Sequence, residues 1–421
     1  MIKYLGSKRA LMPQLSRLAV ASGAEKTLDL FTGTTRVARM LKAQGRFVTA
    51  CDIASYSEVF AKTWIELDAS ECEMPELSEA LAALNALPGE DGYFTKNFCV
   101  DARFFQRTNG RRIDAIREAI DRDYAGSWLR EPLLTSLIMA ADRVDSTTGV
   151  QMAYLKDWSS RSYREIELID PILLHGPGRA IRGDALDVAA QVGAVDLAYL
   201  DPPYNQHRYF TNYHIWETLV RWDKPPAYGV AMKRLDSRAS VNHSVFNKRR
   251  KMPAAFKDVI LNAKTKTLVV SYNNESWVEP IDIAEAMLAA GHESVALLEF
   301  DYKRYIGSQI GIYNKSGAKV GEVGEHGASA QRHRLPRRNR VEVDSGEPVV
   351  RVELRQAPGR LDRNLRVLLH GQRLQRHVVA GAVLRGCAQD LIARRQRGPG
   401  RAERTGRARD RAGRQDLAEQ L

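Results

Sequence analysis

Two short apolar segments separated by a helical stretch constrain the fold of this chain most strongly. Residues 28–31 (LDLF) and 47–52 (FVTACD) predict strands, and residues 35–43 predict a helix between them. A strand, a turn, a helix and a second strand form the unit that opens a doubly wound, Rossmann-like α/β sheet. We therefore expect an α/β fold whose sheet continues late in the chain. Further strands are predicted at residues 194–200, 267–272 and 294–305.

Helical patterns divide this sheet into two halves. The amphipathic stretches IDAIREAIDRDY and EPLLTSLIMAADRV lie in a mostly helical insert between the halves. Outside the insert, helices are predicted at residues 55–68, 74–87 and 281–291. We therefore predict four parts: a first half of the sheet domain at 1–91, the insert at 92–178, a second half at 179–326 and a tail at 327–421.

The tail differs in composition from the rest of the chain. From Gln331 to Leu421 there are 22 arginines, no lysine, ten acidic residues and no Phe, Trp or Tyr, which gives a net charge of +12. The first 330 residues hold 41 basic and 41 acidic residues, so the whole positive excess lies in this tail. A segment without aromatic residues buries little surface, which favours a disordered basic tail that holds phosphates. Arginine without lysine is also typical of a GC-rich gene translated out of frame, with the switch between Gly321 and Gln331.

The residues that follow the strand at 194–200 form a rigid corner, Asp201-Pro202-Pro203-Tyr204. Proline fixes φ and donates no N–H, so the neighbouring carbonyl groups are held in place and point outward. A carboxylate and a proline carbonyl can then accept the two hydrogens of an exocyclic amino group, while the aromatic ring stacks on a base. An ordinary Asp-Pro turn after a core strand is the alternative interpretation.

A glycine after the first strand and an acid after the second indicate a nucleoside cofactor. Gly33 lets the backbone approach a ligand, and the helix that follows favours negative charge at its amino end. Asp52 ends the second strand, about twenty residues on, where an acid commonly accepts the hydroxyls of a ribose. Phe31 and Thr35 flank the glycine and are included in the predicted site. A doubly wound fold that binds no nucleoside is the alternative.

Three motifs in this order resemble the D12 class of N6-adenine-specific DNA methyltransferases, the Dam-like group, and their arrangement resembles its alpha group. The family's opening motif contacts the cofactor through an aromatic residue and a lysine, roles that would fall here on Tyr4 and Lys8. One departure is Thr35, where the family loop usually carries a second glycine. The resemblance covers roughly residues 1–326 and rests on Lys3-Tyr4-Leu5-Gly6-Ser7-Lys8-Arg9, Asp29-Leu30-Phe31-x-Gly33 and the Asp-Pro-Pro-Tyr corner.

The resemblance implies a methyltransferase sheet that binds S-adenosyl-L-methionine and acts on double-stranded DNA. The methionine part of the cofactor would lie beside residues 31–35 and its ribose on Asp52, with Asp201 next to the methyl donor. The target adenine must leave the duplex, because its amino group is paired there. Pro203 belongs to the same corner, and Tyr204 would stack on the flipped base. A cognate restriction endonuclease is a second candidate partner.

Other functions remain open at this stage. An N4-cytosine DNA methyltransferase uses the same amino-group chemistry, although Asp rather than Ser at position 201 favours adenine. A catalytically impaired DNA-binding protein is the alternative from a different class. The four cysteines lack metal-site spacing, so no metal is expected. The sequence also has neither a run of eighteen apolar residues nor a signal peptide, which favours the cytoplasm and no membrane.

Two regions contain basic residues that could contact DNA. One is the insert, where arginines and Asn109 could reach base edges. The other follows the Asp-Pro-Pro-Tyr corner and could hold phosphates, with a solvated basic surface as the alternative. Its basic residues are Lys233, Arg234, Arg238, Lys248, Arg249, Arg250 and Lys251.

Overall fold

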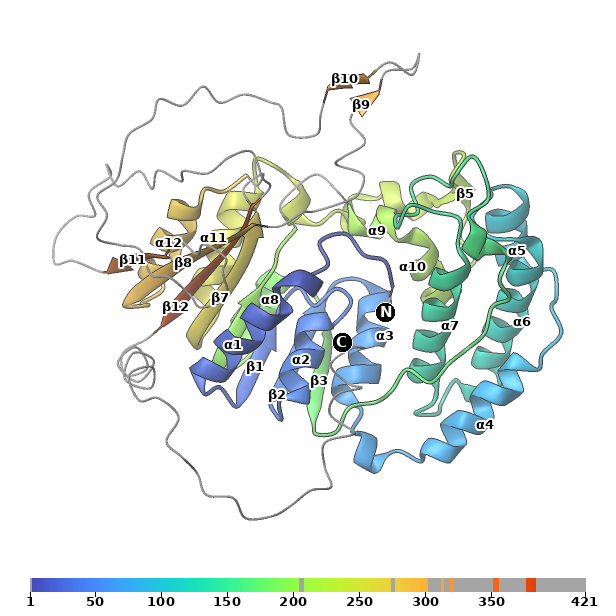
Figure 1. Ribbon diagram of the computed structural model, residues 1–421, viewed down its shortest axis with the longest axis horizontal. Coiled ribbons are helices and arrows are strands. Elements are labelled where there is room, and N and C mark those ends of the chain that lie inside the picture. The colour runs from blue at the N-terminus through green and yellow to red at the C-terminus, as the bar shows by residue number, and fades with distance from the viewer. Residues whose placement is uncertain are drawn as a thin grey trace.

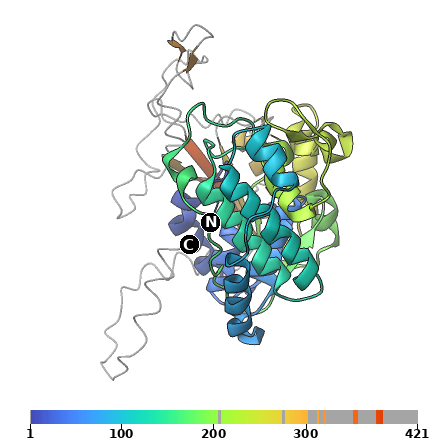
Figure 2. The ribbon, with the colours of Figure 1, turned by 90° about the vertical axis from the view of Figure 1, so that its right-hand side faces the viewer.

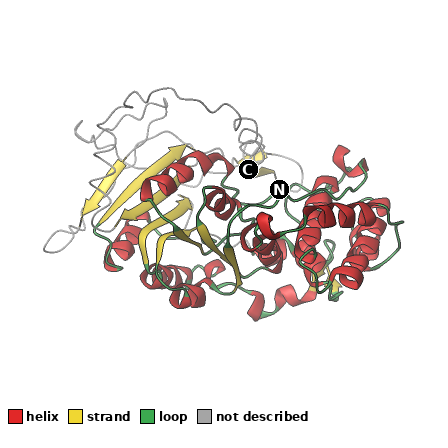
Figure 3. Ribbon diagram, turned by 90° about the horizontal axis from the view of Figure 1, so that it is seen from below, coloured by secondary structure: helices red, strands yellow, loops and turns green. Residues whose placement is uncertain are grey.

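The computed structural model describes residues 2–203, 208–273 and 277–301, together with short strands at 312–313, 319–321, 351–355 and 376–383. The strands of the main sheet gather in one half of the molecule, and a group of helices forms the other half (Figure 1, Figure 3).

Five parallel strands form the centre of the main sheet and confirm the predicted α/β fold. Parallel strands joined by helices are the architecture expected of a doubly wound domain. The first strand ends at Asp29, so Leu30 and Phe31 belong to the turn rather than to the strand. The spatial order is β3 (Gly178–Arg182), β2 (Phe47–Asp52), β1 (Lys26–Asp29), β4 (Val195–Leu200) and β7 (Thr265–Asn273).

Both faces of this sheet are buried, because successive residues of a strand point to opposite sides. In β4, Leu197 and Tyr199 belong to one core and Ala198 and Leu200 to the other. The first core includes α1 (Met12–Ser22), α2 (Arg36–Ala43) and α3 (Ser55–Ala61). The second includes α8 (Ala185–Gln191), α11 (Met252–Asn262) and α12 (Pro280–Ala289).

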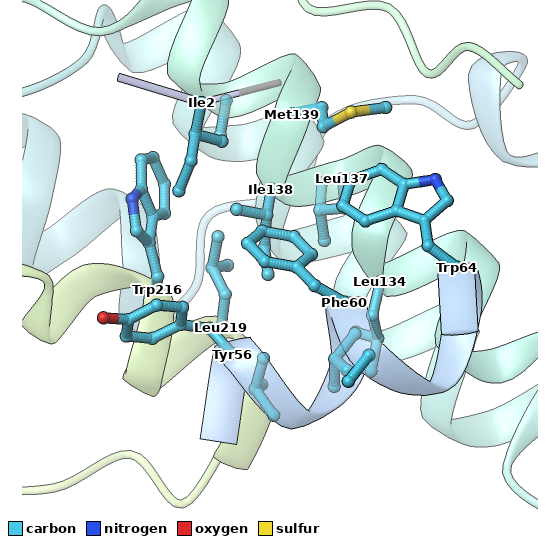
Figure 4. Packing of buried hydrophobic residues seen from close by; sticks show 14 of the residues in the cluster. Ile2, Tyr56, Phe60, Trp64, Leu134, Leu137, Ile138, Met139, Trp216 and Leu219 are labelled. Atoms are coloured by element: carbon cyan, nitrogen blue, oxygen red, sulfur yellow. The ribbon is translucent and has the colours of Figure 1, made fainter. Parts of the chain in front are cut away.

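The helical half packs onto the sheet through α3, which continues as a π-helix, η2 (Lys62–Glu66). Tyr56, Phe60 and Trp64 of this continuous helix lie among the side chains of two other helices, including Ile138 and Trp216 (Figure 4). Figure 2 shows the helical half facing the viewer. Its helices are α4 (Met74–Asn85), α5 (Tyr93–Thr95), the π-helix η4 (Lys96–Val100), α6 (Arg107–Tyr124), α7 (Arg130–Val144), α9 (Tyr209–Asn212) and α10 (His214–Arg221).

The helical half therefore contains more than the predicted insert. Helix α4 precedes residue 92, yet it packs against α6 and α7, and α10 packs against α3 and α7. Helix α10 begins 13 residues after Asp201, so the segment that follows the predicted catalytic corner joins the helical half to the sheet. The boundaries at residues 91 and 178 stay predictions.

Two segments of the arginine-rich tail form strands, which differs from the expectation of a tail without regular structure. The second, β12 (Arg376–Val383), pairs antiparallel with both β7 and β8 (Ser294–Asp301), and β11 (Arg351–Arg355) pairs antiparallel with β8. The physical reason is local: β12 contains the apolar run Val-Val-Ala-Gly-Ala-Val, and valine favours strands even where aromatic residues are lacking. The out-of-frame origin of the tail stays a hypothesis.

Small elements complete the described parts of the chain. A hairpin of β5 (Ala227–Tyr228) and β6 (Lys233–Arg234) follows α10, and β9 (Ile312–Tyr313) pairs with β10 (Lys319–Gly321). The short 3-10 helices are η1 (Arg9–Leu11), η3 (Ala69–Glu71), η5 (Ser160–Tyr163), η6 (Leu235–Arg238), η7 (Ser240–Asn242) and η8 (Val245–Asn247).

Candidate active site

A cavity of about 320 Å³ lies at the carboxyl ends of β1, β2, β3 and β4. This is the edge at which open α/β sheets bind their ligands. The cavity brings together three motifs that are far apart in the sequence. Pro202 and Thr35 do not line it, and Tyr204 lies outside the described residues. The predicted site residues that do line it are Tyr4, Lys8, Phe31, Gly33, Asp52, Asp201 and Pro203.

An ion pair between buried Lys8 and partly buried Asp201 joins the opening motif to the Asp-Pro-Pro-Tyr corner. Lys8 Nζ lies 2.6 Å from Oδ2 of Asp201 and also donates to the carbonyl oxygen of Gly6 at 2.9 Å. The Lys8 side chain is only 5% exposed. Burial raises the pKa of Asp201, and the ammonium of Lys8 opposes that rise. Oδ1 of Asp201 has no hydrogen-bond partner among the described residues, so it is available to a ligand.

A second carboxylate, Asp29, lies at the end of β1 and is fully buried. It is 1% exposed, and its Oδ1 also lacks a partner within the described parts of the chain. Burial raises the pKa of Asp29 to about 7, and the nearby carboxylates of Asp201 and Asp52 add to this rise. A buried acid with an unused oxygen on a cavity wall is suited to a cationic ligand group.

Asp52 and Gly33 are connected by a hydrogen bond that shapes the turn after β1. Oδ2 of Asp52 accepts the Gly33 N–H at 2.9 Å, and Oδ1 accepts the Ala54 N–H at 3.0 Å. Gly33 has φ +51°, and a Cβ atom there would lie 3.0 Å from Cε1 of Tyr4. Only glycine meets both conditions without strain, because it tolerates positive φ and has no side chain.

Tyr4 lies in a cluster of tyrosines behind this turn. Its ring stacks on Tyr213 with a centroid distance of 4.7 Å and on Tyr209 at 5.3 Å. Its hydroxyl lies 3.3 Å from that of Tyr56. Burial raises the pKa of the Tyr4 phenol, which keeps it neutral. The Tyr4 side chain therefore packs directly against the Gly33 turn.

Thr35 occupies a backbone conformation that suits glycine. Its φ of 59° and ψ of 17° are left-handed, and it is the N-cap of α2. The side chain is fully buried and donates to the carbonyl of Thr34 at 2.6 Å. The Thr35 N–H donates to the Thr32 carbonyl at 2.7 Å. Because both donors are used within the loop, Thr35 shapes the turn from outside the cavity.

The cavity has further polar and aromatic walls that sequence reasoning missed. Asp184 follows β3 and caps α8 by accepting the Leu186 N–H at 2.9 Å. Its place at the carboxyl end of a strand was a signal that could have identified it. Phe246 packs on Phe31 with a centroid distance of 5.0 Å. Glu217 of α10 also lines the cavity, although no local pattern marks it.

The described residues contain no cluster of histidine, cysteine and acidic side chains that could hold a metal ion, and no described helix is long and apolar enough to cross a membrane. The groups that line this site include carboxylates, a lysine, three arginines, hydroxyl and amide side chains, and aromatic and aliphatic side chains.

Several characterised proteins are similar to this chain. Modification methylase StsI from Streptococcus sanguinis is 29% identical over 72% of this chain and 49% of its own length. Type II methyltransferase M.NlaIII from Neisseria lactamica is 28% identical over 72% of this chain and 92% of its own length. Type II methyltransferase M.FokI from Planomicrobium okeanokoites is 27% identical over 77% of this chain and 56% of its own length. The chain thus spans about half the length of two of these relatives and most of the third.

A family model describes the same relationship and covers the cavity. The model of the D12 class N6 adenine-specific DNA methyltransferases matches residues 4–283, which include Tyr4 and Lys8 of the opening motif, the turn after β1 and Asp201. A methyltransferase family of this kind implies a methyl donor and a DNA substrate. The chain belongs to the family of D12 class N6 adenine-specific DNA methyltransferases.

Proposed function

We propose that this protein transfers a methyl group from S-adenosyl-L-methionine to the N6 amino group of a specific adenine in double-stranded DNA. The observation that carries the proposal is the state of Asp201. Lys8 holds its Oδ2, while its Oδ1 has no partner among the described residues and lies on the same cavity as the turn after β1.

The residues around the cavity fit the chemical groups of this cofactor. The unused oxygen of Asp29 suits the ammonium group of the cofactor's methionine part. Because Gly33 has no side chain, the backbone of the turn after β1 can lie close to the same part of the cofactor. Asp52 suits the ribose hydroxyls. Ile53 and Asp184, on neighbouring parts of the wall, suit the flat face and the amino group of the adenine. When bound, the cofactor supplies an electrophilic methyl group on a sulfonium.

Asp201 would make the adenine amino group reactive. The N6 lone pair is delocalised into the ring, so the free amino group is a poor nucleophile. If Oδ1 of Asp201 and the carbonyl of Pro202 each accept one hydrogen, the nitrogen turns its lone pair toward the cavity. Such positioning and electrostatic stabilisation can supply several kcal/mol. Pro203 would keep the corner rigid, and Tyr204 would stack on the base.

An exposed basic ridge, Lys248 to Lys251, is our candidate for contacts with the DNA backbone. It consists of four consecutive exposed cations that follow Asn247, a residue of the cavity wall. These four form no salt bridge with the described residues. Unpaired cations beside the mouth of a base pocket would hold phosphates of a strand whose target base has flipped out. A restriction endonuclease that cuts the same site would be a cognate partner.

Methyl transfer from labelled S-adenosylmethionine to unmethylated DNA tests the proposal. We expect nucleoside analysis of the product to show N6-methyladenine. Asp201→Ala should abolish transfer while S-adenosylhomocysteine still binds, because Oδ1 acts on the base. Wild-type turnover in this variant would refute the assignment of Asp201. N4-methylcytosine in the product would support the cytosine alternative, and an absence of any modified base would support a protein that only binds DNA.

A further inference from the structure

Glu217 is a buried carboxylate to which no role has been assigned. It lies on α10, is 1% exposed, and lines the cavity. Oε1 accepts the Ser55 N–H at 2.9 Å, at the first turn of α3. Oε2 has no hydrogen-bond partner among the described residues. Burying half of a carboxylate without a partner costs free energy, so a ligand that donates to it would relieve this cost.

The position of Glu217 along the carboxyl edge of the sheet indicates which part of a ligand its side chain contacts. The strands β4, β1, β2 and β3 lie side by side, and the cavity runs along their carboxyl ends. Asp201 follows β4, whereas Asp52 ends β2 and Ser55 comes three residues later. Glu217 contacts Ser55, so it lies at the β2 end of the cavity, away from the end where methyl transfer is proposed.

Asp52 has two acceptor positions left for ligand hydroxyls. Each of its oxygens already accepts one backbone N–H, from Gly33 and Ala54. A carboxylate oxygen has two lone pairs, so each keeps one acceptor position. A ribose presents two hydroxyls, and a second carboxylate at this end would let Asp52 accept from one and Glu217 from the other.

We propose that Glu217 is a second ribose contact of the cofactor site and that its Oε2 accepts one ribose hydroxyl beside Asp52. This inference rests on the proposed binding of S-adenosylmethionine. Helix α10, which belongs to the helical half, would then contact directly a ligand that is otherwise bound at the edge of the sheet. Ser55 keeps Oε1 in place, so the free oxygen is directed before the ligand arrives.

Calorimetric binding to S-adenosylhomocysteine and to its 2′-deoxy and 3′-deoxy analogues tests this contact. We expect Glu217→Ala to weaken binding of the parent ligand by about tenfold or more, the effect of one charge-assisted hydrogen bond. The analogue that lacks the hydroxyl bound by Glu217 should bind the wild type more weakly than the parent ligand does, by a similar factor. It should bind Glu217→Ala as tightly as the parent ligand does. Glu217→Gln keeps the shape of the side chain, so its affinity for the parent ligand should lie between those of the wild type and Glu217→Ala. This variant replaces Glu217→Ala in the test if the alanine variant does not fold.

Glu131→Gln is the matched control. Glu131 is a carboxylate on α7 that pairs with Arg130 at 3.4 Å and does not line the cavity, so its replacement should leave all three affinities unchanged. Equal losses for all three ligands in the Glu217 variants would overturn the proposal, because they would indicate only a structural role in α3. Unchanged affinity would overturn it as well. If the wild type did not bind S-adenosylhomocysteine, the proposed function itself would fail.

Discussion

Buried Lys8 and partly buried Asp201 form an ion pair that connects the amino-terminal motif to the carboxyl end of β4. A buried carboxylate without a cation would tend to protonate, because desolvation disfavours its charged form. The ion pair favours the charged form in Asp201 and leaves Oδ1 to act as an acceptor. Lys8 is therefore a positioning residue for Asp201 in addition to its predicted contact with the cofactor.

Replacing Lys8 should alter the pH dependence of catalysis. In Lys8→Ala the pKa of Asp201 loses the opposing effect of the ammonium and rises further, so the acidic limb of the kcat profile should move to higher pH. We expect kcat at neutral pH to fall by on the order of 10²-fold. Lys8→Arg should recover part of the activity, and Arg9→Ala, at an exposed neighbour, should leave the profile unchanged. An acidic limb that stays in place in Lys8→Ala would contradict this role.

Asp29 should make the ligand-free protein less stable as the pH rises. The pKa of this carboxyl is about 7 in the folded state and ordinarily 3.8, so the folded protein binds the extra proton between these limits. Stability is therefore lost as the pH rises from about 4 to about 7. At pH 7.5 the free energy of unfolding of Asp29→Asn, measured with urea, should exceed that of the wild type by on the order of 4 kcal/mol. The two proteins should converge near pH 4, and a constant difference at all pH values would exclude this titration.

Gly33→Ala should weaken both the fold and cofactor binding. The new Cβ would meet the Tyr4 ring at 3.0 Å on a backbone with φ +51°. Gly45→Ala is the control, since Gly45 has φ +81° but a Cβ atom added there would have nothing within 4 Å. We expect urea unfolding to show a loss of about 1 kcal/mol for Gly45→Ala and a larger loss for Gly33→Ala. Only Gly33→Ala should lose affinity for S-adenosylhomocysteine, and equal effects in both would rule out the contact with Tyr4.

Thr35→Gly should preserve or increase stability. A β-branched residue at φ 59° carries strain of about 1–2 kcal/mol, which glycine removes, although glycine costs about 0.5–1 kcal/mol through the unfolded chain. We expect the free energy of unfolding to increase by between zero and about 1.5 kcal/mol. Thr34→Gly, at a position without positive φ, should destabilise the protein. A clear loss of stability in Thr35→Gly would mean that its hydrogen bond to Thr34 outweighs the strain.

Neutralising the basic ridge should weaken DNA binding without changing which sequence is preferred. Replacing Arg249 and Arg250 with alanine removes two candidate phosphate contacts, so the slope of log K against log salt should become shallower by roughly 1–2. Arg122→Ala is the control, because Arg122 is exposed on α6 and pairs with Asp123 at 2.7 Å. An unchanged slope in the ridge variant would place the DNA elsewhere on the surface.

Local patterns predicted most of the elements that support the site. The strands β2, β4 and β7 and the helices α2, α3 and α12 lie within a few residues of their expected positions, because alternating or 3.6-residue periodicity is a local property. The tail was harder to predict. Its composition favoured disorder, yet a single valine-rich run sufficed for β12 to pair with β7 and β8.

Residue order and type in the sequence were sufficient to indicate the chemistry: a glycine turn, an acid after the second strand and an Asp-Pro-Pro-Tyr corner. Those features depend on neighbours within a few positions. The ion pair of Lys8 with Asp201, the left-handed backbone of Thr35 and the place of Glu217 depend on how distant segments pack. Parallel strands bring their carboxyl ends to one edge, and α10 reaches that edge only because its core is shared with α3 and α7. No local pattern encodes such contacts, since their distances arise only when the sheet and the helices close around one cavity.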